Sequence, residues 1–231
     1  MGLALGQALA RRGVDVALTF HRSREPLEAA AEAVRAAGCR ALVLAADLSK
    51  SSSCQQAVDD TVDAFGRLDI LVNLASRYVR YDMESLNARA FEHDLAVDLG
   101  SSFHCSMAAV PYMRRVGGGR ILNCSDWVAA SGRPRYRGYL PYYVAKSGVI
   151  ALTEALALEL APDGILVNAL APGPILAAEG MSERERGAVV RITPLGRWGG
   201  EEAFVSAALS LIETDFITGE TVRVDGGRHL V

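Results

Sequence analysis

The chain has 231 residues, 50% of them hydrophobic and 22% charged, and this balance excludes a mainly disordered protein. A formal net charge of −3 argues against binding to nucleic acid or an anionic membrane surface, and the uncharged runs are too short or too broken by Gly and Pro to span a bilayer. The four cysteines have no CxxC spacing and no His cluster nearby, which argues against zinc and disulfide scaffolds and for a reduced, cytoplasmic protein.

Helical and strand-like segments alternate from end to end. The pattern predicts helices over residues 3–12, 25–37, 53–65, 84–115, 141–161 and 201–213. It predicts strands, as short apolar runs, over residues 14–20, 40–45, 69–73, 120–124, 165–169 and 221–224. This alternation is typical of a parallel sheet with helices on both faces. No repeat or linker divides the chain, so we expect one α/β domain over residues 1–231, a doubly wound parallel sheet in three layers.

Ligands of such sheets bind beyond the carboxyl ends of the strands. The residues at those positions are His21-Arg22-Ser23, Asp47, residues 73–76, Ser125-Asp126 and Pro172-Gly173. A further candidate pair lies on a predicted helix, where Tyr142 and Lys146 are four residues apart and therefore share one helix face. A nearby ammonium pulls the phenol pKa down from about 10, which makes tyrosine usable as an acid–base group. Lys146 is one of just two lysines among 24 Lys and Arg residues, although the same spacing also occurs in ordinary helix-surface pairs.

Six motifs in order make nearly the whole chain resemble the short-chain dehydrogenase/reductase family. They are Asp47-Leu48, Asn73-Leu74-Ala75-Ser76, residues 119–126, Tyr142-x-x-x-Lys146, Pro172-Gly173, and Ile217-Thr218-Gly219-Glu220 with Val224-Asp225-Gly226-Gly227. The resemblance implies a Rossmann-type fold and an NAD(P)-dependent oxidoreductase in which Tyr142 and Lys146 are catalytic. It also implies a homotetramer built on the long helices near residues 91–115 and 142–161.

Two finer features resemble the pteridine reductase branch of that family. The branch has an aspartate in place of the usual catalytic serine, and the matching position here is Asp126. It also carries His-Arg-Ser after its second strand, as in His21-Arg22-Ser23. The resemblance implies that Tyr142 protonates a C=N nitrogen with help from Asp126, while Lys146 lowers the tyrosine pKa and holds the nicotinamide ribose. The alternative is that Asp126 is a surface residue at the strand end and that Ser125 serves instead.

The residues after the first predicted strand favour NADPH. An acidic residue there would bind the ribose hydroxyls of NAD, whereas Arg22 and Ser23 suit the 2′-phosphate of NADP. No Asp or Glu lies between the end of this strand and Glu25. A solvated loop is the alternative, and tighter or equal NADH binding would contradict the hypothesis. We expect NADP(H) as cofactor and no metal. The predicted cofactor-binding residues are Gly2, His21, Arg22, Ser23, Asp47, Leu48, Asn73, Ala75, Tyr142, Lys146, Pro172, Gly173 and Ile175.

Two segments are candidates for the substrate pocket. Residues 127–141, rich in Arg and Tyr, are either a cover that stacks aromatic rings on a flat substrate or a solvated loop. Residues 174–200 resemble the mobile substrate-binding segment of the family. In that segment Leu176, Met181 and Trp198 are either pocket walls or ordinary core residues.

The chain departs from the family pattern in three places. Gly2 falls where the family has the last glycine of a Thr-Gly-x-x-x-Gly-x-Gly turn, and the strand before that turn is absent. In the family that strand lies in the middle of the sheet, which here would be next to the strands over 14–20 and 69–73. Losing five or six buried apolar side chains, at about 1.5–3 kcal/mol each, would remove as much free energy as a domain's margin of about 5–15 kcal/mol. We therefore expect Met1 to be an internal methionine of a longer chain, or another segment or subunit to fill the gap. Leu74 replaces an Asn, and Asp98 replaces the Asn that anchors a proton-relay water, where a carboxylate can still accept from Lys146.

Three functions remain open. The first is NADPH-dependent reduction of a pterin-like C=N substrate. The second is NADPH-dependent reduction of ketones such as 3-oxoacyl thioesters, with Ser125 as the hydroxyl. The third is a catalytically impaired family member without cofactor binding, which acts as a binding or oligomerising partner. For the two enzymes the expected partners are a small-molecule substrate and further copies of the chain, and neither nucleic acid nor a membrane.

Overall fold

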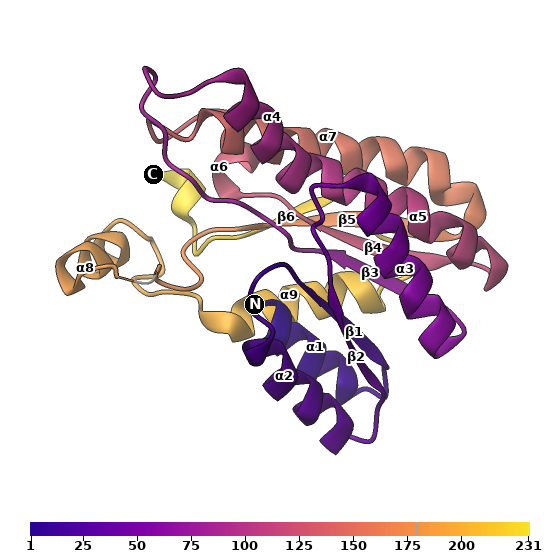
Figure 1. Ribbon diagram of the computed structural model, residues 1–231. Helices are drawn as coiled ribbons and strands as arrows, with labels where there is room; N and C mark the ends of the chain where they lie inside the picture. Colours follow the sequence, from indigo (N-terminus) through magenta and orange to yellow (C-terminus); the bar gives the residue numbers. More distant parts are fainter. Residues whose placement is uncertain (179) are drawn as a thin grey trace.

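Six parallel strands form the framework of the computed structural model, which describes residues 1–178 and 180–231 (Figure 1). They form two sheets, one of two strands and one of four, in the order β1-β2 and β3-β4-β5-β6. Their bounds are β1 Val16–Phe20, β2 Ala41–Ala45, β3 Ile70–Asn73, β4 Gly119–Cys124, β5 Ile165–Pro172 and β6 Thr221–Val224. Every paired strand runs parallel to its neighbour, which confirms the predicted α/β class.

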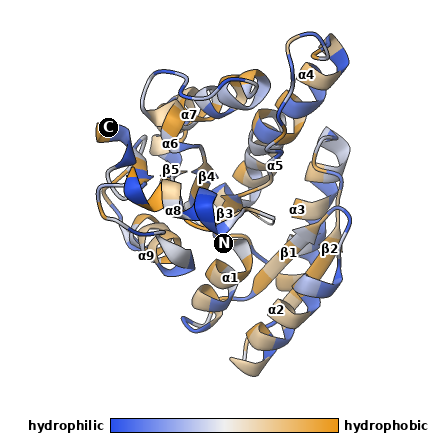
Figure 2. Ribbon diagram, turned by 90° about the vertical axis from the view of Figure 1, so that its left-hand side faces the viewer, coloured by the Kyte–Doolittle hydropathy of each residue, from blue (hydrophilic) through white to orange (hydrophobic). Residues whose placement is uncertain are grey.

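The long helices cover both faces of the sheets, as the continuous apolar strands predict (Figure 2). One face packs against α1 (Gly2–Ala10), α2 (Glu25–Ala36) and α9 (Gly200–Glu213). The other face packs against α3 (Ser51–Phe65), α5 (Ser101–Arg115) and α7 (Leu140–Leu160). Every helix and strand predicted from the sequence is present, with ends shifted by a few residues.

Shorter elements account for the differences from the predicted pattern. The expected helix over 84–115 starts later, at α4 (Ala88–Leu95), because Asn87 caps its first turn by accepting a hydrogen bond from the Ala90 amide at 3.0 Å. A π-helical turn at Ala96–Gly100 joins α4 to α5. The sequence pattern missed α6 (Trp127–Ala130) and α8 (Glu183–Arg191). The α8 helix carries no buried side chain, so it has no apolar stripe to reveal it.

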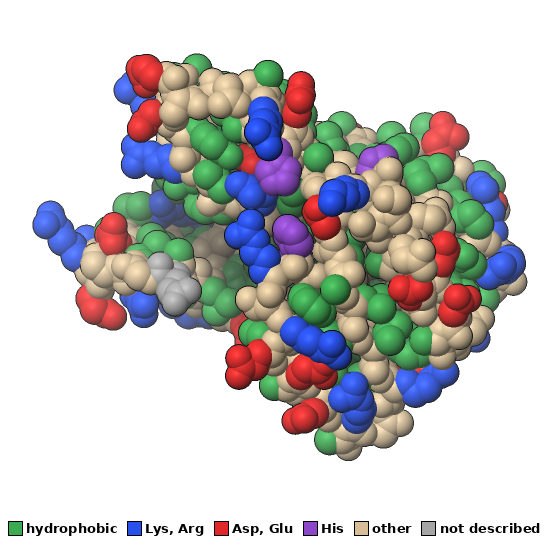
Figure 3. Space-filling model, viewed as in Figure 1, with side chains coloured by type: hydrophobic (Ala, Val, Ile, Leu, Met, Phe, Trp, Pro, Cys, Tyr) green, Lys and Arg blue, Asp and Glu red, His purple; other side chains and the backbone are tan. Residues whose placement is uncertain are grey.

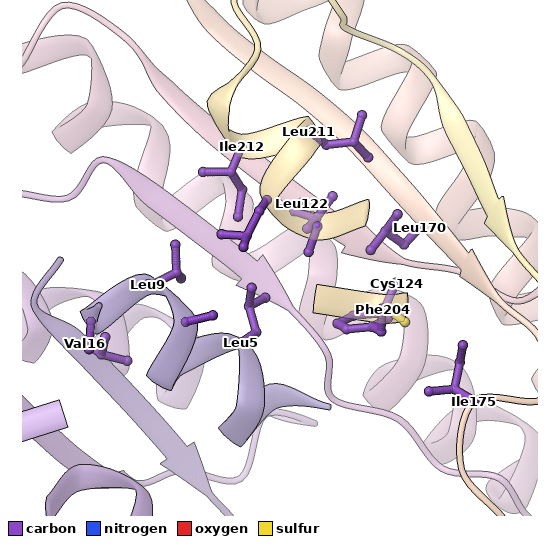
Figure 4. Packing of buried hydrophobic residues seen from close by; sticks show 14 of the residues in the cluster. Leu5, Leu9, Val16, Leu122, Cys124, Leu170, Ile175, Phe204, Leu211 and Ile212 are labelled. Carbon is purple, nitrogen blue, oxygen red and sulfur yellow. The ribbon is translucent and has the colours of Figure 1, made fainter. Parts of the chain in front are cut away.

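Two hydrophobic clusters, one on each side of the sheet, hold the layers together. In the first, Leu5 and Leu9 of α1 pack with Phe204 and Ile212 of α9, as Figure 4 shows. The second lies beneath α5 and α7 and contains Met113 together with Ile121 of β4 and Ile165 and Val167 of β5. Burial of each large aliphatic side chain contributes about 1.5–3 kcal/mol, so these clusters fix the positions of the strand ends where the site is built.

A cleft of about 1020 Å³ separates β1 from β3. Both strands line it, together with residues of α1 and of the segments that follow β1, β2 and β3. Within the described residues β1 pairs with β2 alone and β3 with β4 alone, so the two facing edges carry no strand between them. This is the position at which the sequence analysis expects a strand to be absent. Among the same residues, no helix is long and apolar enough to cross a membrane.

Candidate active site

The carboxyl end of β4 and the start of α7 bring together the central pair of the site. Asp126 follows β4 by two residues and is the N-cap of α6, where its Oδ1 accepts a hydrogen bond from the Val128 amide at 2.7 Å. Tyr142 lies in the first turn of α7, and its hydroxyl donates to Asp126 Oδ2 at 3.0 Å. One carboxylate oxygen therefore holds the local backbone, and the other binds the candidate proton donor.

Asp126 is a carboxyl group that keeps its proton more readily than an ordinary aspartate. Burial raises its pKa, and the Val128 amide, the Tyr142 hydroxyl and the Lys146 ammonium only partly oppose that effect. A carboxyl group with a raised pKa can donate a proton as well as accept one. This is chemistry that a serine hydroxyl in the same place could not provide.

The pKa of Tyr142 is raised, and the expected lowering by Lys146 is not what the geometry produces. Burial is the main cause, followed by the negative charge of Asp126. Lys146 is only 2% exposed, and its ammonium is already engaged. It donates to the Cys124 carbonyl at 2.8 Å and forms an ion pair with Asp98 at 3.3 Å. The expectation was wrong because it treated the lysine charge as free.

Asp98 is the anion that holds Lys146. It lies in the π-helical turn, fully buried, and it also accepts hydrogen bonds from the Ser76 hydroxyl and from the Arg77 amide at 3.1 Å. The carboxylate therefore connects the segment after β3 with α7. The sequence-based proposal that Asp98 could accept from Lys146 agrees with this contact.

Ser125, the alternative catalytic hydroxyl, points away from the pair. Its hydroxyl donates to the Lys146 carbonyl at 2.8 Å, and the residue is buried. It is absent from the residues that line the pocket around Tyr142. The structure thus brings Asp126, and not Ser125, to the tyrosine hydroxyl.

A small pocket of about 40 Å³ lies over this pair. Its lining comes from Asp126 after β4, from α6, α7 and the loop over residues 131–139 and, unexpectedly, from Tyr78. The lining residues are Tyr78, Asp126, Trp127, Val128, Ala129, Pro134, Arg135, Tyr136, Tyr139, Tyr142, Tyr143 and Lys146. The sequence pattern indicated the loop but not Tyr78. Tyr78 follows the carboxyl end of β3, and that position could have indicated it as a site residue.

Most of the predicted cofactor residues line the large cleft instead. The cleft-lining members of that set are Gly2, His21, Arg22, Asp47, Leu48, Asn73 and Ala75. Ser23 is exposed and does not line the cleft. Two of the lining side chains have their own structural partners. Asp47 accepts from the Ser49 hydroxyl at 2.6 Å, which together with Lys50 lowers its pKa to about 2. Asn73 donates to Asn123 at 2.9 Å and so links β3 to β4.

The part of the cleft beyond the strand ends carries groups that suit a nicotinamide dinucleotide. The cleft volume of about 1020 Å³ also includes the space between the facing edges of β1 and β3, so the lining groups, and not the volume, indicate the cofactor. Figure 3 shows basic and histidine side chains gathered near a hollow on this face. His21 and Arg22 belong to the cleft lining and can bind a phosphate, and the N-terminus of α1 at Gly2 opens onto the same space.

Three further predicted cofactor residues, like Ser23, lie outside both cavities. Pro172 ends β5, and Gly173 packs so closely on the residue after β6 that a Cβ there would lie 2.6 Å from the Cβ of Asp225. Ile175 belongs to the hydrophobic cluster with Phe204. Of the three proposed walls in the segment over 174–200, Leu176 is exposed and none lines either cavity. The glycine therefore serves sheet packing, and the side chain of Ile175 serves the core.

The chain is similar to known proteins in both sequence and structure. A family model described as "Enoyl-(Acyl carrier protein) reductase" matches residues 1–229. The 3-oxoacyl-(acyl-carrier-protein) reductase FabG of Staphylococcus aureus is 32% identical over 237 residues, covering 100% of this chain and 94% of that protein. The short-chain reductase protein NovJ of Streptomyces niveus is 34% identical over 239 residues, covering 99% and 89%.

Solved structures with the same fold are also similar in sequence. A short-chain dehydrogenase/reductase from Serratia marcescens superposes with a TM-score of 0.91 at 33% identity, covering 99% of this chain and 93% of that one. An acetoin dehydrogenase from Enterobacter cloacae gives a TM-score of 0.90 at 32% identity, covering 99% and 91%. These matches extend over both the split sheet and the Tyr142 pocket.

Proposed function

The chain belongs to the short-chain dehydrogenase/reductase family of oxidoreductases, and we propose that it is an NADPH-dependent reductase of a pterin-like C=N bond. One observation carries the proposal: the Tyr142 hydroxyl donates at 3.0 Å to the half-buried Asp126, which stands where the resemblance places the usual serine. Reduction of C=N requires a proton on nitrogen, and a pair of neighbouring acidic groups is suited to deliver it.

The residues of the site have different roles in the proposed reaction. Tyr142 would give its proton to the substrate nitrogen, and a protonated Asp126 would then return a proton to the tyrosine oxygen across the 3.0 Å contact between them; solvent would reprotonate Asp126 after the product leaves. Lys146, which forms an ion pair with Asp98 at 3.3 Å, would bind the nicotinamide ribose. NADPH would supply the hydride. Lys146 and Asp98 are buried, which strengthens the ion pair between them.

The preference for NADPH rests on the end of β1. Arg22 offers a planar guanidinium for the 2′-phosphate, and the adjoining exposed positions are His21 and Ser23 rather than an acid. His21 and Arg22, which line the cleft, would hold the 2′-phosphate.

A second candidate is reduction of a ketone such as a 3-oxoacyl thioester. The observation that favours it is the name of the Staphylococcus aureus relative, a 3-oxoacyl-(acyl-carrier-protein) reductase. With the Ser125 hydroxyl committed to the Lys146 carbonyl, a neutral Asp126 would have to polarise the carbonyl in this chain.

We also propose that copies of the chain associate through α5 and α7 as a cytoplasmic homotetramer. Large apolar side chains are exposed on both helices, including Phe103 and Met107 on α5 and Leu158 on α7. Sedimentation of the wild type and of Phe103→Glu tests this. A wild-type monomer would contradict it.

Binding and turnover test the proposed activity in sequence. Nicotinamide fluorescence is followed while NADPH and NADH are titrated into the protein, and we expect NADPH to bind more tightly. Turnover of dihydrobiopterin and of acetoacetyl-CoA is then compared for wild type, Asp126→Ala and Ser125→Ala. Loss of pterin turnover in the Asp126 variant alone supports the first candidate. Acetoacetyl-CoA turnover without pterin turnover selects the second, and loss only in the serine variant contradicts the role of Asp126.

A further inference from the structure

Two loops meet over the Tyr142 pocket. One follows β3 and carries Tyr78, and the other precedes α7 and carries Tyr139. The two rings are stacked, with centroids 4.4 Å apart and planes inclined by 16°. Next to the stack, the Tyr81 amide donates to the Gly138 carbonyl at 2.8 Å. The loops are therefore joined by one aromatic contact and one backbone hydrogen bond at the pocket entrance.

The same stack reaches the proton donor. Tyr78 presents its edge to the Tyr142 ring, with centroids 4.8 Å apart and planes at 80°. The space left over Tyr142 and Asp126 is about 40 Å³, whereas pockets for organic ligands commonly enclose about 300–1,000 Å³. A substrate can approach the Tyr142 hydroxyl only if the Tyr78–Tyr139 contact opens.

Two parts of the second loop are held differently, the part around Arg135 and the part formed by Gly138 and Tyr139. Arg135 donates to the carbonyls of His229 and Val231 and lies over the Trp127 ring, so this part is tied to the last turn of the chain. The other part reaches Tyr139 through Gly138, whose φ of +87° suits glycine. A Cβ at Gly138 would lie 2.8 Å from Arg80 Cγ, so the loops can close this tightly only with glycine there.

We propose that Tyr139 and Tyr78 form a gate that selects substrates by their shape. A flat ring takes the place of the Tyr139 ring against the face of Tyr78, and a thick substrate is excluded. The inference rests on the proposed reductase activity, because it concerns which substrates reach Tyr142. An aromatic face favours another flat ring in offset or edge contact, and the position of the Tyr139 ring shows that the space beside Tyr78 accepts one. A branched or caged carbonyl compound has no flat face to place in that layer.

Isatin and camphorquinone form a matched pair of substrates for the test. Both are vicinal dicarbonyl compounds, but isatin is flat and camphorquinone is a thick cage. The ratio of their kcat/KM values is measured with NADPH for wild type, Tyr139→Ala, Tyr139→Phe and the remote control Tyr112→Ala on α5. We expect wild type to favour isatin by at least about tenfold, a size of discrimination typical of shape selection in a pocket. The Tyr139→Phe and Tyr112→Ala variants should keep the ratio, and Tyr139→Ala should reduce it to about threefold or less.

An equal ratio in wild type and Tyr139→Ala would overturn the gate, as would a Tyr139→Phe variant that behaves like Tyr139→Ala. Amide exchange gives a readout that does not depend on turnover. We expect Tyr139→Ala to accelerate exchange in the peptide containing the Tyr81 amide, and Tyr112→Ala to leave it unchanged. The proposed reductase activity fails only if dihydrobiopterin is not reduced either. Whenever neither dicarbonyl compound is reduced, the exchange result alone decides whether the loops are held by this stack, and unchanged exchange in Tyr139→Ala overturns the gate.

Discussion

The Tyr142 pocket and the β1–β3 cleft hold their polar groups in different ways. In the pocket, the Tyr142 hydroxyl, Asp126 and Lys146 each have a partner within 3.3 Å, and none of the three residues is exposed. At the cleft rim, His21 and Arg22 are exposed. The polar groups of the pocket are thus positioned by contacts within the protein, whereas the side chains at the rim face solvent. Substitutions in the pocket should therefore have larger effects than substitutions at the rim.

The largest effect is expected for Asp126, because it serves both chemistry and structure. Asp126→Ala should lower turnover by about 10²- to 10⁴-fold, the usual contribution of a positioned acid–base group. It should also cost about 0.5–2 kcal/mol of stability through the lost cap of α6. Asp126→Asn can keep the cap but cannot titrate, so it should lose turnover while staying near wild-type stability. Full turnover in Asp126→Asn, measured beside urea unfolding, would contradict the proposed role.

Lys146 gives the next largest effect, this time on folding. Lys146→Met leaves the buried Asp98 carboxylate without its cation, and breaking a buried ion pair in this way costs about 3–5 kcal/mol. Adding Asp98→Asn to that variant removes the unpaired charge and should recover part of the loss. The measurement is the free energy of unfolding in urea for the two single variants and the double variant. Strictly additive losses would show that the pair is not coupled.

A smaller effect is expected at the cleft rim, where Arg22 is tested against a neighbouring arginine. Arg22→Ala should weaken NADPH binding by about 10- to 100-fold, since hydrogen bonds to charged groups contribute about 1.5–3 kcal/mol. NADH binding should change little. Arg24→Ala is the matched control, because Arg24 is exposed and pairs with Glu28 at 2.6 Å. Equal losses of NADPH and NADH affinity in Arg22→Ala would argue against recognition of the 2′-phosphate.

The smallest effect is a pair of opposite pH dependences, one from each region. The pKa of Asp126 is raised by burial, so its stabilising contribution is complete below the ordinary value of about 4 and is lost as pH rises through the folded value. Asp126→Asn should therefore gain stability relative to wild type as pH rises. The pKa of Asp47 is lowered to about 2, so its contribution is present above about 4 and is lost as pH falls toward 2. Asp47→Asn should lose stability relative to wild type above pH 4. Melting temperatures between pH 3 and 8 check both signs, and parallel curves for the three proteins would contradict them.

The elements that the sequence predicted best are those with a strong local signal. The strand over 221–224 has the predicted bounds, and the helix over 25–37 ends within one residue of the prediction. Their apolar runs and terminal glycines leave few alternatives. The exposed helix over Glu183–Arg191 has no apolar face, and its Ser182–Glu185 capping box was the only local sign of it.

The site was predictable as a set of strand ends but not as a set of contacts. Parallel strands place their carboxyl ends at one edge, which is why Asp126 could be predicted as a site residue. Tyr142 and Lys146 were added by their four-residue spacing on a helix and by the family resemblance. What each side chain does there depends on its neighbours in space. Three contacts in the site are long-range, and no local pattern encodes them. Lys146 pairs with Asp98, Ser125 donates to the Lys146 carbonyl, and Tyr78 stacks on Tyr139.

The two facing strand edges along the cleft define what a covering segment must look like. Each edge of β1 and β3 that faces the cleft presents backbone N–H and C=O groups beside apolar side chains, within the part of the chain that the structure describes. Unpaired edges of this kind are templates for an added strand. One extended, apolar segment that pairs with both edges would satisfy these backbone groups and join the two sheets into a single one. The same segment would protect the protein from edge-to-edge pairing between copies.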